Sequence, residues 1–215
     1  MTPTTTTRTA IDVGPKRPVD QIRSAGVACA LGGLVLATGG VTGQILQAST
    51  SVSDELWRYP WSERAAVLAW AAFGSAGVLL GVGILAWRRS GVAGSGRAAR
   101  VGLPLAALGT LLIAAGHFAC IPVRDHTIHD TSAQLVGAVL FVGSVLSAAG
   151  LLLAGRATLR AGVWQDRRRF VPISAGVATV ALIGLAPTKA MPTGVALYAL
   201  GFAALGLALA RTRQA

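Results

Sequence analysis

The chain of 215 residues is 53% hydrophobic and only 13% charged, whereas a soluble domain normally carries about 25% charged residues. This composition argues against a soluble domain. Lys and Arg outnumber Asp and Glu by 19 to 8, a formal net charge of +11. The excess does not indicate nucleic-acid binding, because no stretch interleaves basic and aromatic residues as a single-strand-binding surface does.

The N-terminal segment, residues 1–23, is rich in Thr, contains Pro and has no apolar periodicity. It predicts a disordered cytosolic tail. The apolar run that follows is longer than the core of a signal peptide, so we interpret it as a retained first span. Residues 212–215 are expected to form a short cytosolic tail at the other end of the chain.

Six apolar segments follow the N-terminal tail. A helix needs about 20 mainly apolar residues to cross about 30 Å of hydrocarbon. The six segments are residues 25–48, 65–87, 101–121, 133–154, 170–186 and 191–210. Only residues 170–186 fall short of that length, at the lower edge of the range for a span. The sequence therefore predicts an all-α fold: one membrane domain over residues 24–211, a compact bundle of six transmembrane helices.

The basic residues predict how this bundle is oriented. Placing the pair Arg88 and Arg89 in lipid would cost about 5–7 kcal/mol, so it belongs in a loop. Fifteen basic residues fall on the side of the two termini and four on the other, which assigns both termini to the cytoplasm. The four are Arg58, Arg64, Arg124 and Lys189. Because the basic residues are mostly Arg, and Ala and Gly are abundant, we expect a bacterial plasma membrane.

Glycine pairs predict where helices pack closely, and aromatic residues predict where the chain meets the membrane surface. Two glycine pairs with three intervening residues each share a helix face: Gly39 with Gly43, and Gly77 with Gly81. Such faces let helices approach closely, and we favour packing within the bundle over dimerisation. Trp57, Tyr59 and Trp61 are expected to lie in an interfacial aromatic belt.

All three histidines lie in residues 117–130, where Pro122 is expected to end the third span. His126 and His129 would share a face if a helix begins there. With Asp125 and Asp130 they could hold zinc or another divalent metal ion. The alternative, which we favour, is that the acidic residues or Thr127 cap the fourth span.

His117 lies about one turn inside the third span, where an ionisable group is costly and counts as a site hypothesis. Gln44, Gln47 and Gln134 occupy the outer thirds of their spans. The four side chains could line a polar vestibule that opens outward. The alternative, slightly favoured, is that they form hydrogen bonds between helices.

Six spans and an acidic first outer loop that contains aromatic residues accompany a short motif before the fourth span. The motif reads Ile121-Pro122-Val123-Arg124-Asp125 and is followed by His129. This combination resembles family 998 of the domains of unknown function. The resemblance implies a bacterial membrane protein and no assigned reaction.

Three functions are open at this point. No complete catalytic motif occurs, which favours a non-enzymatic protein acting through helix packing or through contact with another membrane protein or a second copy in the bilayer. The second is a metal or small-molecule site, with hydrolysis as one use, at the outer ends of spans one, three and four. The third is a small-solute carrier, although no Asp, Glu, Lys or Arg lies deep within a span.

Overall fold

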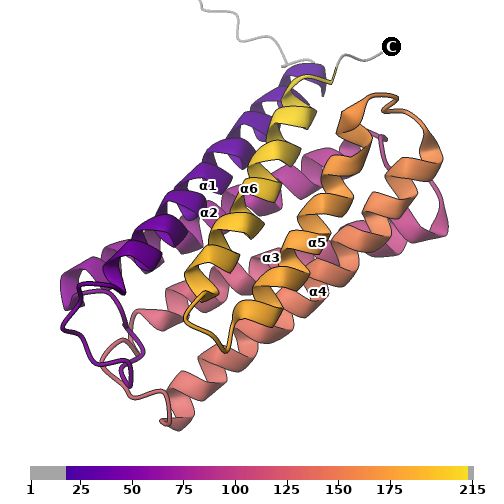
Figure 1. Cartoon of the computed structure of the whole chain (residues 1–215). Coiled ribbons are helices and arrows are strands. Elements are labelled where there is room, and N and C mark those ends of the chain that lie inside the picture. Colours follow the sequence, from indigo (N-terminus) through magenta and orange to yellow (C-terminus); the bar gives the residue numbers. More distant parts are fainter. Residues whose placement is uncertain (1–17, 213–215) are drawn as a thin grey trace, which may run out of the picture.

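Six long α-helices make up the structure, a computed structural model that describes residues 18–212 (Figure 1). A short 3-10 helix, η1 (Arg167–Phe170), precedes α5, and no strand occurs in the described range. The helices are α1 (Pro18–Leu46), α2 (Glu63–Arg89), α3 (Arg97–Cys120), α4 (Thr131–Ala161), α5 (Val171–Leu185) and α6 (Met191–Ala210). All six, α5 together with η1, are long and apolar enough to cross a membrane. The predicted all-α fold is confirmed.

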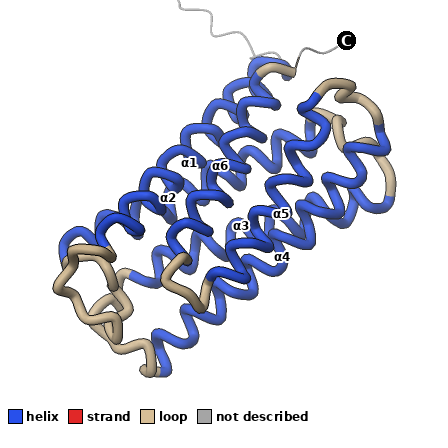
Figure 2. The backbone as a smooth tube through the Cα atoms, viewed as in Figure 1, coloured by secondary structure: helices blue, strands red, loops and turns tan. Residues whose placement is uncertain are grey.

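The helices form a closed ring. Each packs against its neighbours in chain order, α6 returns to α1, and α2 also meets α6 across the ring. The start of α1 and the end of α6 lie together with the 90–96 and 162–166 loops, which we call the terminus end (Figure 2). The 47–62, 121–130 and 186–190 loops lie at the opposite end, which we call the far end.

Large apolar side chains cover the outside of the ring. Leu68 is 72% exposed, Ile45 65% and Leu135 64%. A water-soluble monomer rarely shows continuous apolar surface on this scale, whereas helices whose backbone groups are bonded internally can carry it in lipid. The bundle is therefore built for contact with a bilayer.

The helix α1 begins earlier than the sequence analysis predicted. Residues 18–23, which we had assigned to a disordered tail, form its first turns. Pro18 suits a first helical position because its φ is fixed and the missing N–H has no partner there anyway. Asp20 in the first turn adds a favourable interaction with the helix dipole. Residues 1–17 and 213–215 of the predicted tails lie outside the described residues.

Asp166 shapes the turn between α4 and α5. Its carboxylate accepts hydrogen bonds from the backbone N–H of Arg168 at 3.0 Å and from the Nε of the same residue at 2.7 Å. These bonds hold the pKa of Asp166 below its ordinary value. Arg168 also donates to the carbonyl of Arg211 at 3.3 Å, so this loop is tied to the end of α6.

Glycines seven residues apart bring two pairs of helices into backbone contact. Gly26, Gly33 and Gly40 of α1 face α6, and Gly102 and Gly109 of α3 face α4. A Cβ added at Gly33 would lie 2.6 Å from the backbone nitrogen of Ala203, and one at Gly109 would lie 2.3 Å from that of Ser147. A seven-residue repeat keeps such positions on one seam of a left-handed helix pair. We call these contacts the α1–α6 seam and the α3–α4 seam.

The seams are reciprocal. A Cβ at Gly206 of α6 would lie 2.4 Å from the nitrogen of Ala30, and one at Gly150 of α4 would lie 2.2 Å from that of Ala106. Both helices of each seam therefore place glycines against the backbone of the other helix. Neither chain segment can acquire a side chain at these positions without the two backbones moving apart.

The glycine pairs singled out in the sequence serve a different geometry. A Cβ at Gly39 would overlap the ring of Phe73 from α2, whereas one at Gly43 would be in ordinary contact with Trp61 and Pro192. Gly77 and Gly81 lie against side chains of α3, Ala114 and Leu111. All four glycines contact other segments of the same chain, mostly through side chains.

We expect Gly109→Ala and Gly206→Ala each to destabilise the bundle by about 1–3 kcal/mol, because an added methyl group overpacks a backbone contact. The control is Gly184→Ala, where a Cβ meets nothing within 4 Å and alanine is the better helix former. Thermal unfolding in detergent, followed by tryptophan fluorescence, would measure the shift in Tm. Equal Tm values for the seam variants and the control would contradict the seams' role.

Candidate functional site

Two loops from different helical hairpins fold onto each other at the far end. Residues 47–62 connect α1 to α2, and residues 121–130 connect α3 to α4. Leu56 and Thr127 form an isolated antiparallel bridge. Backbone hydrogen bonds flank it, from Trp57 N–H to the His126 carbonyl at 2.9 Å, from Ile128 to Glu55 at 2.8 Å and from Arg58 to Arg124 at 3.2 Å. We call this pair of loops the clasp.

An ion-pair network reinforces the clasp. Asp125 pairs with Arg58 from the other loop and with Arg124, whose Nε lies 3.3 Å from Oδ2. Arg124 also lies 3.4 Å from Glu63, the first residue of α2. Exposed pairs contribute only about 0.2–1 kcal/mol each. Arg58, however, is 22% exposed, so removing Asp125 would leave a half-buried guanidinium without its carboxylate.

An apolar cluster lies beneath the clasp. It consists of Ala66, Trp70, Cys120, Val123 and Val136, with Trp57 and Trp61 packed against it. The ring of Trp57 would lie 3.2 Å from a Cβ at Gly137 of α4. Trp57 and Trp61 therefore anchor the first loop to the helix ends, and their place in an interfacial aromatic belt stays a prediction.

His126 and Asp130 are used in the second loop itself. His126 Nδ1 lies 2.7 Å from the Ser132 hydroxyl and 3.8 Å from the Asp130 carboxylate. Asp130 accepts the backbone N–H of Thr127 at 2.7 Å. It directly precedes α4 but makes no side-chain bond to the first turn of that helix, so it caps the loop's turn instead.

The four residues predicted as metal ligands do not form a ligand set. Within residues 18–212, no three His, Cys, Asp or Glu side chains lie together in a way that could hold a metal ion. Asp125 pairs with two arginines, Asp130 bonds to backbone, and His129 is exposed. The four residues are close together in the sequence, but Asp125 pairs with Arg58 of the other loop, which the spacing does not indicate.

The glutamines predicted to line a polar vestibule do not all meet at one place. Gln44 accepts a hydrogen bond from the Thr193 hydroxyl of α6 at 2.9 Å and lies 3.5 Å from Gln47. Gln134 donates to the backbone carbonyl of His129 at 3.4 Å. Gln44 and Gln47 therefore share one local contact and Gln134 makes another, and only the bond to Thr193 joins two helices.

His117 belongs to a row of rings. Its Nδ1 donates to the carbonyl of Ile113 at 2.9 Å, one turn earlier in α3. Its ring meets Phe73 of α2 edge-to-face, with centroids 5.5 Å apart, and Phe73 meets Trp61 in the same manner at 6.3 Å. The row runs from the clasp into the bundle, and Gly39 of α1 provides the space for Phe73.

No protein-family model, no curated protein and no solved structure matches the chain. The resemblance to family 998 of the domains of unknown function stays a prediction. The function must be argued from the clasp and its surroundings.

We expect Asp125→Asn to loosen both loops of the clasp together, because the asparagine cannot pair ionically with Arg58 and Arg124. Hydrogen exchange of the Trp57 and Ile128 amides should become several-fold faster, the rate change that a loss of about 1 kcal/mol produces. Asp54→Asn is the control, since Asp54 is an exposed carboxylate of the clasp that lies in the 47–62 loop. Faster exchange in residues 121–130 alone would contradict coupling between the loops.

Proposed function

We propose that this chain is a non-enzymatic protein of the bacterial plasma membrane that acts by binding another membrane protein through the clasp. The observation that carries the proposal is that two loops from different hairpins are joined by backbone hydrogen bonds into one folded surface. Long connections without regular secondary structure in compact domains are usually functional or flexible. These two are held in place by the bridge, the ion pairs and two tryptophans.

The chemistry of the clasp supports recognition over catalysis. A Ser-His-Asp relay needs the hydroxyl and the carboxylate at opposite nitrogens of the imidazole. Here Ser132 and Asp130 both approach Nδ1 of His126. The arrangement resembles a triad by composition but cannot pass a proton from serine to histidine while aspartate orients the ring.

The interior of the bundle supports the same choice over a carrier. Buried threonine hydroxyl groups are bonded within one turn: Thr158 donates to Ala154 and Thr179 to Ala175. Thr110 and Ser147 lie 3.3 Å apart across the α3–α4 seam. Two hollows of the described part lie on the outside of the bundle, one on α1 and one between α3 and α4.

The surface of the clasp suits a partner in the same membrane. Ile128 is 42% exposed, and Glu55 and His129 are exposed on either side of the bridge. The loops are tied directly to the helix ends, so their surface lies at the level where another membrane protein, or a second copy, would present its own loops. Mixed apolar and charged groups of this kind are typical of non-obligate interfaces.

The distribution of basic residues supports the orientation. In the described part, arginines gather at the terminus end: Arg23, Arg88, Arg89, Arg97, Arg100, Arg156, Arg160, Arg167, Arg168, Arg169 and Arg211. By the positive-inside rule this end faces the cytoplasm. The clasp then faces the other side of the membrane.

A photo-crosslinking amino acid in place of Ile128 or His129 should give one discrete adduct with a membrane protein when native membranes are irradiated. The same amino acid in place of Leu68, a lipid-facing residue of α2, is the control. An adduct of twice the chain mass would identify the partner as a second copy. Absence of any adduct at the clasp positions, or the same adduct from position 68, would contradict the proposal.

A further inference from the structure

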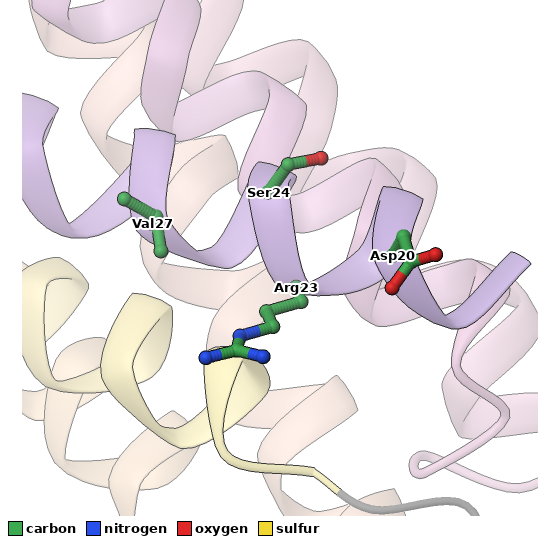
Figure 3. Close-up of a pocket in the computed structure, with 4 residues that line it drawn as sticks. All are labelled: Asp20, Arg23, Ser24 and Val27. Atoms are coloured by element: carbon green, nitrogen blue, oxygen red, sulfur yellow. The ribbon is translucent and has the colours of Figure 1, made fainter. Parts of the chain in front are cut away.

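A groove lies on the outside of α1 at the terminus end, far from the clasp. It has a volume of about 540 Å³ and is lined by Asp20, Arg23, Ser24 and Val27 (Figure 3). All four side chains are exposed. The groove therefore combines an acid, a base, a hydroxyl group and an apolar surface within two turns of one helix.

Within the described part of the chain, the charged groups of the groove are left to a ligand. Among residues 18–212, neither Asp20 nor Arg23 forms an ion pair. Figure 3 shows Arg23 extending toward α6, while Asp20 lies nearer the start of α1. Ser24 donates its hydroxyl proton to the carbonyl of Gln21 at 3.0 Å, so its oxygen is left as an acceptor. The groove thus offers one cationic donor and two acceptors.

An apolar strip continues from the groove along α1. Val27, Leu31 and Val35 follow Arg23 at intervals of four residues, which places them on one helix face. They are 46%, 55% and 44% exposed. Arg23 lies where the apolar part of α1 begins, the level at which arginine side chains meet lipid headgroups. A ligand of matching shape has a polar head at Arg23 and an apolar chain beside Leu31.

We propose that this groove binds one glycerophospholipid whose headgroup carries a phosphate and a primary ammonium. The Arg23 guanidinium donates to the phosphate oxygens in charge-assisted hydrogen bonds. The Asp20 carboxylate and the Ser24 oxygen accept from the ammonium, and one acyl chain follows the strip of Val27, Leu31 and Val35. Basic pockets beside membrane helices are general phosphate-headgroup sites, and the acid adds selectivity here.

Asp20 determines which headgroup is preferred. A quaternary ammonium has no N–H to donate to the carboxylate, and a headgroup with a glycerol instead of an amine has no positive charge to pair with it. Phosphatidylethanolamine satisfies both ends of the groove. Phosphatidylcholine brings a positive charge near Asp20 but no hydrogen bond to it, and phosphatidylglycerol satisfies only Arg23.

The test is native mass spectrometry of the full-length protein, delipidated in detergent and titrated with these three lipids carrying identical acyl chains. We expect phosphatidylethanolamine to bind at least about fivefold more tightly than phosphatidylcholine, a ratio within reach of one charge-assisted hydrogen bond. Arg23→Gln should weaken all three lipids. Asp20→Asn should remove the preference for the primary amine, and phosphatidylcholine should lose less affinity than phosphatidylethanolamine because it loses no hydrogen bond.

The matched control is Arg160→Gln, an exposed arginine at the same end of the bundle but on α4. It should leave the affinities unchanged, and Tm values should show that all variants are folded. Equal binding of the ethanolamine and choline lipids to the wild-type protein would overturn the proposal. So would an Arg160→Gln loss as large as that of Arg23→Gln, or competition by soluble glycerophosphoethanolamine at the lipid's own concentration.

Discussion

Helices in a bilayer gain little from burying apolar side chains against each other, because the surrounding lipid is equally apolar. Close backbone packing must supply the attraction instead, and it requires positions without a side chain. The α1–α6 and α3–α4 seams meet this requirement through glycines at intervals of seven residues. The α1–α6 seam joins the first helix to the last and closes the ring.

The seams also determine what happens at the far end. The α3–α4 seam fixes the helix ends that the 121–130 loop must connect, and the ring places the 47–62 loop next to it. At this end glycine has another use. Gly39 and Gly137 leave room for aromatic side chains, Phe73 and Trp57. The absence of a side chain therefore allows backbone contact along the seams and the insertion of aromatic rings beside the clasp.

Hydropathy was sufficient to predict the six helices, and the bounds of α6 coincide with the predicted span. It could not predict the first turns of α1, which are polar and lie beyond the apolar run. Nor could it predict the seams. Glycines at intervals of seven residues form a seam only where a second helix packs against them, and hydropathy does not say which helix that is. Arg58 and Asp125 are 67 residues apart, and only the closed ring brings them together. Local spacing therefore suggested a metal site where tertiary contacts produce an ion pair.

The absence of charge within the predicted spans confines the polar chemistry of the described chain to its two ends. The buried threonine and serine hydroxyl groups are bonded within one turn or across a seam, as for Thr158 and for Thr110 with Ser147. The two ends of the bundle differ in how their charged side chains are paired. Carboxylates and arginines pair across loops in the clasp, which makes a fixed surface suited to another protein. Asp20 and Arg23 stand apart on a lipid-facing helix, which leaves their charges to a ligand that carries both signs. Both proposed binding surfaces therefore lie outside the packed interior of the bundle, one where the loops meet and one where a helix faces lipid.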